Sequence, residues 1–284
     1  MNNPSSSSVL IVDGHVHIHP VFNLARFLDA AHNNCQYEAQ SRHQTESFTG
    51  FLLLTESLGE NWFQQFASWA DENIVIQNEE GSEWLVHRTR EDGSLLVRAN
   101  HGAELYLVAG RQIVVKENLE VLALLTAAQF PDGMGLKDTV DAVRNEGAVA
   151  VVPWGFGKWW GRRGQILSEF LASQTPTTFF LGDNSGRPGF LPYPPQFQQA
   201  RMQGIAILPG SDPLPFASED WRPCSAGFAI QGVVSPQTPA HDLRQFMVDP
   251  RTRFYPYHQT ENIFRFVRNQ IAMQMVKRRC PKSG

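Results

Sequence analysis

Short apolar runs alternate with polar segments along this chain, and the pattern predicts a protein built from both strands and helices. The runs at 9–12 (VLIV) and 51–55 (FLLLT) have the length of strands, and continuous apolar runs are typical of strands buried on both faces. Tryptophan and phenylalanine recur at helical spacing within 60–73, which predicts an amphipathic helix. Within 74–108 polar and apolar residues alternate, and the Asp92-Gly93 pair indicates a hairpin.

Further along the chain, strand-like and helix-like segments follow one another in a regular order. ELYLVAG and EVLALL predict two more strands, and three strand-and-helix units come after them. The expected strands are 148–152, 178–181 and 205–208, and the expected helices are 136–147, 166–171, 197–202 and 263–276. The proline-rich stretch 209–256 is expected to be loop. Repeated units of this kind predict a parallel sheet with helices outside, and a closed or nearly closed α/β barrel is the natural form at 284 residues.

Composition narrows the choice of partners. A formal charge of -4, from 24 basic and 28 acidic residues, provides no basic field for nucleic acid, so no nucleic-acid partner is expected. Apolar runs fall short of the roughly 18 residues that cross a bilayer, so no membrane partner is expected either. The polar start MNNPSSSS predicts a disordered lead-in over residues 1–8, followed by a single domain over 9–284.

The three cysteines are widely scattered. Cys35, Cys224 and Cys280 form an odd set without CxxC spacing, which favours neither a disulfide framework nor a cysteine zinc site. A reducing cytoplasm fits this pattern best.

Histidines provide the clearest sign of chemistry. Residues 13–20 read DGHVHIHP, directly after the first apolar run. Because a strand sends alternate side chains to one face, His15 and His17 should emerge together, about 6 to 7 Å apart at their roots, and converge on one ion. His19 lies a further step away and is expected to support the ligands from behind. A histidine-bearing strand end without a metal is the simpler alternative.

Carboxylates lie at the ends of several of the other predicted strands. They are Glu56 after the second run, Glu104 at the start of ELYLVAG, Asp183 after FFLG, and Asp212 after AILPG. In α/β barrels the functional groups gather where strands end, so these acids are candidates for one shell of nitrogen and oxygen ligands. Each of them alone is equally explained as a helix cap or a turn residue.

At these positions the chain resembles the polymerase and histidinol phosphatase (PHP) family of metal-dependent hydrolases, over about residues 9–232. DGHVHIHP resembles the family's opening His-x-His, and FLLLTES its strand ending Thr-Asp-His. The stretch NHGAELYLVAGRQIVVKENLEVLALL resembles its Gly-x-Glu strand and the strands after it, EGAVAVVPWG its strand ending His-Pro, and ILPGSDPLPF its closing Ser-Asp-x-His. The resemblance implies a divergent, amidohydrolase-like member with a distorted (β/α)7–8 TIM-like barrel, a β-hairpin insertion and a C-terminal helix.

The resemblance also implies a set of ligands. Family members hold one ion with the opening histidine pair, the Glu of Gly-x-Glu and the Asp of the closing motif, which fall here on His15, His17, Glu104 and Asp212. Three family histidines are replaced, by Ser57, Trp154 and Leu214, so a cluster of three metals is not expected. One divalent ion, Zn(II), Mn(II) or Fe(II), is the expected cofactor.

A single ion is sufficient for hydrolysis, because it lowers the pKa of a bound water and polarises the substrate oxygen. Asp212 is the first candidate to accept a proton from that water, and Glu56 is the second.

The segment WGFGKWWGRR, residues 154–163, joins tryptophans, glycines and basic side chains at a strand end. One interpretation is a substrate clamp, in which Lys158 and Arg162 bind an anion and Trp154 fills the space of the missing histidine. The other is a loop whose tryptophans only pack over the sheet. Asp183 and Arg187, in the neighbouring GDNSGR segment, are further candidates for the same pocket.

The sequence therefore predicts a metal-dependent hydrolase acting on a small anionic substrate. A phosphoester is implied by the resemblance alone, and an amide or lactone is nearly as plausible. The competing hypothesis is a catalytically silent protein that keeps the fold to bind a ligand or partner. The oligomeric state is left open.

Overall fold

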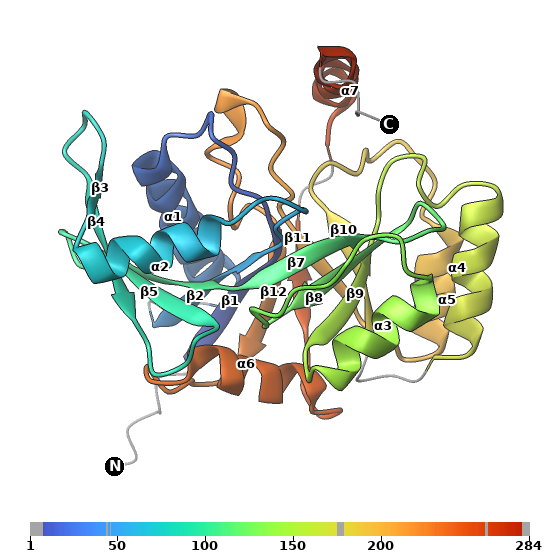
Figure 1. Ribbon diagram of the computed structural model, residues 1–284, viewed down its shortest axis with the longest axis horizontal. Coiled ribbons are helices and arrows are strands. Elements are labelled where there is room, and N and C mark those ends of the chain that lie inside the picture. Colours follow the sequence, from blue (N-terminus) through green and yellow to red (C-terminus); the bar gives the residue numbers. More distant parts are fainter. Residues whose placement is uncertain (1–7, 44, 46, 175–178, 259–260, 280–284) are drawn as a thin grey trace.

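The structure of this chain is a computed structural model that describes residues 8–43, 45, 47–174, 179–258 and 261–279, with side chains to residue 273 (Figure 1). Residues 1–7 of the predicted lead-in and Cys280 lie outside the described residues. The helices are α1 (Leu24–His43), α2 (Trp62–Glu72), α3 (Leu136–Asn145), α4 (Arg162–Ala172), α5 (Pro195–Met202), α6 (Pro239–Val248) and α7 (Ile263–Arg279). A short 3-10 turn spans Ala217–Glu219.

The strands are β1 (Val9–Val16), β2 (Phe48–Leu54), β3 (Val75–Gln77), β4 (Glu83–Arg88), β5 (Ser94–Ala99), β6 (Glu104–Val108), β7 (Gly110–Val114), β8 (Glu120–Leu124), β9 (Val149–Pro153), β10 (Phe179–Asn184), β11 (Ile207–Gly210), β12 (Gly227–Gln231) and β13 (Tyr255–Tyr257). Across the described residues they form an eight-stranded sheet, ordered β13-β12-β1-β2-β6-β5-β4-β3, and a five-stranded sheet, ordered β11-β10-β9-β8-β7.

The prediction of a closed TIM-like barrel is wrong. Neither sheet closes on itself within the described residues, and parallel pairing is confined to two three-stranded runs, β1-β2-β6 and β9-β10-β11. Antiparallel strands flank both runs: β12 pairs with β1, β5 pairs with β6, and β8 pairs with β9. The strand-and-helix units of the second half therefore build part of an open sheet rather than one wall of a barrel.

The two sheets face each other across a shared core. In β1, Leu10 and Val12 belong to this central core, whereas the alternate residues Val9 and Ile11 pack outward against α1 and α2. On the second sheet, strand residues such as Val151 face inward, and α3, α4 and α5 cover the opposite face (Figure 1). This explains why the strand segments are apolar at consecutive positions, since both of their faces are buried.

Polar contacts join the ends of the two sheets. Glu56 and Arg111 form an isolated parallel bridge between the end of β2 and β7. At the other junction the backbone N–H of Asp212, just after β11, donates to the carbonyl of His15 at 2.8 Å. The carboxyl ends of β1 and β11 are thereby held side by side, which places the candidate site between the sheets.

Most predicted elements are confirmed, with three exceptions. The stretch 209–256 is not only loop, since it contains β12 and α6. The sequence does not predict helix α1. It also does not predict β7, which follows β6 directly in the chain but belongs to the other sheet. Among the described residues, no helix combines the length and the apolar character needed to pass through a lipid bilayer.

Candidate metal centre

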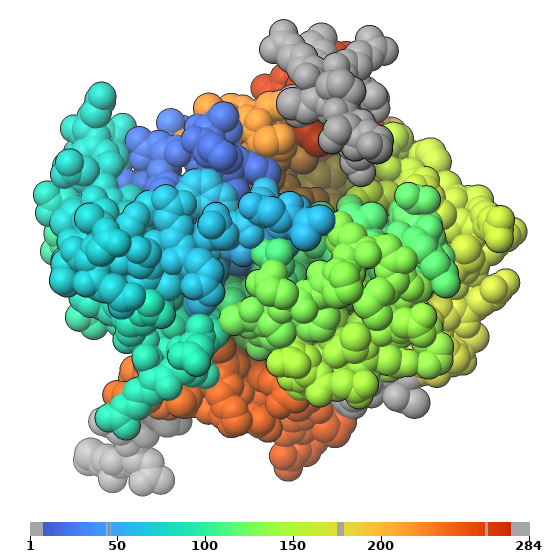
Figure 2. All heavy atoms as spheres, in the orientation of Figure 1, coloured from blue at the N-terminus to red at the C-terminus, as the bar shows by residue number. Residues whose placement is uncertain are grey.

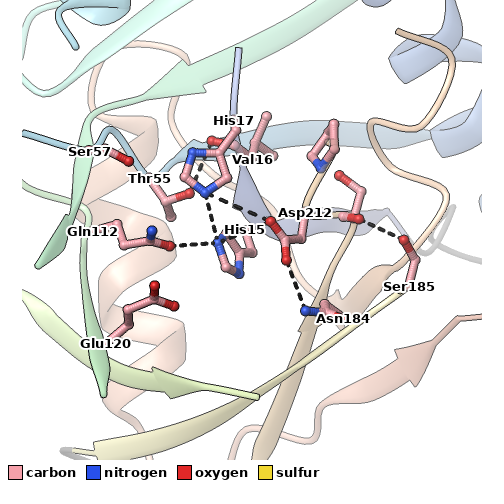
Figure 3. A network of polar contacts seen from close by, with 12 residues as sticks. His15, Val16, His17, Thr55, Ser57, Gln112, Glu120, Asn184, Ser185 and Asp212 are labelled. Carbon is pink, nitrogen blue, oxygen red and sulfur yellow. Dashed lines mark hydrogen bonds and ion pairs between the residues drawn. The ribbon is translucent and has the colours of Figure 1, made fainter. Parts of the chain in front are cut away.

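Three side chains that are distant in sequence meet at one point of the structure. His15 is the residue before the last one of β1, His17 follows that strand directly, and Asp212 lies just after β11. One ligand atom from each residue lies within 4.8 Å of the other two, and Figure 3 shows the two imidazoles and the carboxylate pointing toward a common centre. Among the described residues, this is the group of histidines and acids whose geometry could hold a metal ion.

A buried carboxylate fixes the backbone under the cluster. Asp13 accepts hydrogen bonds from the backbone N–H groups of His15 at 3.2 Å, Ser211 at 2.8 Å and Cys224 at 2.7 Å. Burial raises the pKa of Asp13 to about 7, while these N–H donors pull it down. One side chain thus ties β1, the end of β11 and the loop before β12 together.

Two glycines allow the strands to approach this closely. A side chain at Gly210 would collide with the backbone nitrogen of His15, and one at Gly14 would lie 2.9 Å from the carbonyl oxygen of Pro209. Asp212 itself has a φ of +45°, in the left-handed region that residues with a side chain rarely adopt. Its N–H bond to His15 holds it there, and backbone strain of this kind is concentrated at functional sites.

The distances fit a single ion. The Nε2 atoms of His15 and His17 are 3.1 Å apart, and each lies 3.7 or 3.8 Å from Oδ1 of Asp212. Two metal–ligand bonds of about 2.1 Å that meet at a tetrahedral angle place their donor atoms about 3.4 Å apart. The three observed separations bracket that value. Without an ion, one imidazole would have to donate a hydrogen bond to the other.

The charge states also suit metal binding. Burial, and then the neighbouring His15, lower the pKa of His17, which keeps its imidazole neutral and its lone pair free. Burial by itself would raise the pKa of Asp212, but electrostatic interactions with His15, His17, Lys158 and Arg222 outweigh it and lower the pKa overall. Neutral imidazole and ionised carboxylate are the forms that coordinate metals.

A further layer of polar side chains surrounds the cluster. Gln112 Oε1, from β7, lies 3.2 Å from Nε2 of His15, and Asn184, from the end of β10, donates to Oδ2 of Asp212 at 2.9 Å (Figure 3). Nδ1 of His17 faces Glu60 Oε2 at 4.0 Å. A carboxylate near this nitrogen favours a proton on Nδ1, and that leaves Nε2 free for the metal.

His19 occupies the place expected for a supporting residue. Its ring stacks on that of His17 with centroids 5.9 Å apart, and its Nε2 lies 3.1 Å from the carbonyl oxygen of Pro213. It lies outside the group of three candidate ligands, and a supporting role for it stays a prediction.

Glu104, the fourth predicted ligand, is not at the cluster. It opens β6, and β6 runs parallel to β2 and β1, so Glu104 lies at the amino end of the sheet while the histidines lie at the carboxyl end. Its carboxylate accepts from Nε of Arg98 at 2.6 Å on the surface. The candidate ligand set therefore contains three protein residues rather than four.

Glu56, the second candidate base, is held by other partners. Its carboxylate accepts a hydrogen bond from the N–H of Phe63, in the first turn of α2, and another from Arg111 at 3.2 Å. Burial raises the pKa of Glu56, against the lowering effect of these two donors. The Glu56 side chain caps α2 and joins the two sheets, so it is not available as a base at the cluster.

Some residues of the loop 154–163 fit the packing interpretation and others fit the anion-binding one. Trp154 and Trp159 are buried in the core that covers the second sheet, so they pack rather than bind. Lys158 forms an ion pair with Glu120, at the start of β8, and both act electrostatically on the cluster. Arg162 begins α4 on the surface and is exposed. Of the predicted anion donors, Lys158 is the one whose charge acts on Asp212.

Asp183 and Arg187 form a buried pair. Nε of Arg187 donates to Oδ1 of Asp183 at 2.8 Å, and Nη2 donates to Oδ2 at 2.8 Å. His258 lies against the same carboxylate at 3.5 Å. These contacts fix the turn that carries Asn184 toward Asp212, so the pair positions the site instead of lining it.

The sequence reasoning missed Gln112, Glu60 and Glu120 and gave no role to Asn184. Gln112 could have been found from the sequence. Gly110-Arg111-Gln112 has the same Gly-x-polar spacing as Gly102-Ala103-Glu104, the segment that was compared with the family's Gly-x-Glu strand. Glu60 has no such signal, because its position depends on the turn between β2 and α2.

Comparison with known proteins gives a fold and no family. No protein-family model matches the chain, and no curated protein matches it. Among solved structures, the crystal structure of PsfC from Pseudomonas syringae PB-5123 is similar, with a TM-score of 0.52 and 14% identity over 95% of this chain and 99% of that chain. The two proteins share an overall fold, and the resemblance to the PHP family stays a prediction.

Proposed function

We propose that this protein is a metal-dependent hydrolase with one divalent ion held by His15, His17 and Asp212, acting on a small anionic substrate. The observation that carries the proposal is the convergence of two Nε2 atoms and one Oδ1 atom, 3.1 to 3.8 Å apart, from segments that are distant in the sequence. Two nitrogen ligands and one carboxylate form the donor set of many catalytic zinc sites, which keep a coordination position for water or substrate.

The surrounding side chains suit this chemistry. An ion bound there would supply Lewis acidity toward water and a substrate oxygen. The Asp212 side chain is 26% exposed, so solvent reaches the cluster, and its second oxygen is oriented by Asn184. Asp212 is ionised and placed to take up a proton, although a ligating carboxylate is a weaker base than a free one.

Lys158 provides the argument for an anionic substrate. Its ammonium group is partly exposed, pairs with Glu120 and acts on Asp212. A negatively charged substrate group can approach this partly exposed side chain and share its ammonium group with Glu120, so that neither charge loses its partner. A phosphoester fits this description, and a carboxylate-bearing amide or lactone fits it equally.

The test compares two variants for metal content and turnover. We expect the wild type, dialysed against trace Zn(II) or Mn(II), to retain about one ion per chain, and His17→Ala to retain less than about a tenth of that. Glu104→Gln is the matched control, because it removes the acid that the sequence favoured and the structure places elsewhere. Equal metal content in the wild type and His17→Ala would contradict the proposal.

Activity is assayed with p-nitrophenyl phosphate mono- and diesters and with a panel of amides and lactones that carry a carboxylate. Turnover that depends on the ion and is lost in His17→Ala supports a hydrolase. Stoichiometric metal without turnover on any of these substrates favours the alternative of a binding protein that retains a metal.

A further inference from the structure

Helix α7 presents its apolar side chains outward. Ile263, Phe264, Val267 and Ile271 are exposed, Phe264 to 86% of its surface. Figure 1 shows α7 end-on at the upper rim, outside the two sheets and their covering helices, and in Figure 2 red spheres from this end of the chain are visible at the same rim. A helix that packs on a soluble domain normally buries such residues, so this face lacks a cover among the described residues.

The inward face of α7 is joined to a different part of the chain. Phe266 is buried, and its ring lies 4.9 Å from that of Phe156 and 5.8 Å from that of Phe190. The Phe156 ring in turn lies 5.0 Å from that of Trp160. Phe156, Trp160 and Phe190 are themselves exposed, so further exposed apolar side chains lie next to the contact that Phe266 makes. We call these seven exposed residues, Phe156, Trp160, Phe190, Ile263, Phe264, Val267 and Ile271, the α7 surface.

Charge in these two segments is of one sign. Helix α7 contains five Lys and Arg residues and the loop 154–163 contains three, and neither segment contains Asp or Glu. The whole chain, by contrast, has more acidic than basic residues, 28 against 24. Arg265 pairs with Glu219 and Glu261, and Lys158 pairs with Glu120, all acids from other segments. An apolar face on segments with an excess of basic residues, on an otherwise acidic protein, is complementary to an anionic partner.

We propose that the α7 surface docks on an anionic lipid membrane, with α7 lying in the plane of the headgroups. A basic amphipathic helix with aromatic and aliphatic residues on its other face is the type of element that binds there without spanning the bilayer. Anionic headgroups attract juxtaposed Lys and Arg residues, and the apolar side chains insert among the acyl chains. Nucleic acid could stack on the aromatic members of the α7 surface, but it fits less well, because Ile263, Val267 and Ile271 provide no flat surface on which bases stack.

Vesicle co-sedimentation tests this proposal with the full chain. We expect binding to phosphatidylcholine vesicles that contain about 30% phosphatidylserine, weak binding to phosphatidylcholine alone, and release as the salt concentration rises to about 0.5 M. The double variant Phe264→Ser, Ile271→Ser should bind at least about tenfold more weakly, because it removes two inserted apolar side chains. The matched control is Met202→Ser, Val233→Ser, which changes side chains that are 83% and 73% exposed elsewhere on the surface.

Four outcomes would overturn the proposal, and the first three concern vesicle binding and self-association. They are no binding to the anionic vesicles, equal binding by the wild type and the double variant, and a concentration-dependent dimer, detected by light scattering, that the double variant abolishes while vesicles do not bind. Tight binding of single-stranded nucleic acid in place of vesicles would also overturn it. His17→Ala should bind vesicles like the wild type, so this test is independent of the metal site.

Discussion

At the scale of single residues, the proton on His17 decides whether the cluster can bind an ion. Glu60 is the carboxylate that faces Nδ1 of His17, at 4.0 Å. Glu60→Gln replaces an anion with a neutral amide and weakens the preference for the tautomer with a free Nε2. We expect the affinity for Zn(II) to fall about tenfold, which is typical of changes behind the ligands. Competition with a fluorescent chelator measures this affinity.

The control for this prediction is Glu79→Gln, since Glu79 is exposed on the β3–β4 turn. If both variants bound Zn(II) as tightly as the wild type, Glu60 would have no part in orienting His17.

The sequence predicted the centre of the site more fully than its surroundings. His15, His17 and Asp212 follow strand-like runs, and strands that end together bring such residues together. Glu104 was wrongly predicted as a ligand. It begins its strand, and because that strand runs parallel to β2, its first residue lies at the edge of the sheet opposite the histidines. The partners of Asp13 come from residues about 200 positions away, and no local pattern reveals them.

At the scale of elements, the approach of β1 to β11 depends on Gly210. A Cβ atom there would overlap the backbone and Cβ of His15, so either the strands separate or the backbone distorts. We expect Gly210→Ala to lower the free energy of unfolding by at least about 2 kcal/mol, since overpacking of a rigid junction is costly. Urea denaturation followed by circular dichroism measures the change.

Gly93→Ala provides the comparison, because a side chain at that turn meets nothing within 4 Å and the residue lacks a left-handed φ. Its unfolding free energy should stay within about 0.5 kcal/mol of the wild type. A Gly210→Ala protein as stable as Gly93→Ala would show that the close approach is dispensable.

Elements with strong periodicity were predicted correctly and weakly patterned ones were not. Helix α2 and the β4–β5 hairpin follow from spaced aromatics and from the Asp92-Gly93 turn. Helix α1 was missed because Asn, Gln and His residues interrupt its apolar positions. Strand β12 and helix α6 were missed because prolines around them suggested loop.

At the scale of the whole molecule, local patterns identified strands but not their partners. The same apolar run suits a parallel or an antiparallel neighbour, so the barrel was inferred from the order of elements alone. In the structure β6 lies beside β2, and β12 beside β1, although long stretches of sequence separate them. The chain therefore forms two facing sheets, and its site lies where their ends meet.

Stability should depend on pH through Glu219, a fully buried acid that pairs with Arg222 and lies 3.6 Å from Arg265. Burial raises the pKa of Glu219 above its usual 4.5, against the lowering effect of both arginines. Its contribution is fully present below the unfolded pKa of about 4.3 and is lost as the pH rises through the folded pKa. The stability of the wild type relative to Glu219→Gln should therefore fall as the pH rises from about 4.

Asp249 should show the opposite trend. The hydrogen bonds from Arg251 lower its pKa to about 2, so its contribution is present above the unfolded pKa and is lost as the pH falls. Urea denaturation between about pH 3 and 7 of the wild type, Glu219→Gln and Asp249→Asn measures both slopes. Parallel curves for all three proteins would contradict the assignment.

Anomalous X-ray diffraction from crystals soaked in Zn(II) or Mn(II) tests the central claim most directly. The account predicts one strong peak about 2.1 Å from Nε2 of His15, Nε2 of His17 and Oδ1 of Asp212. A peak bound elsewhere on the chain, or a metal-free map in which the two imidazoles remain hydrogen-bonded to each other, would contradict it.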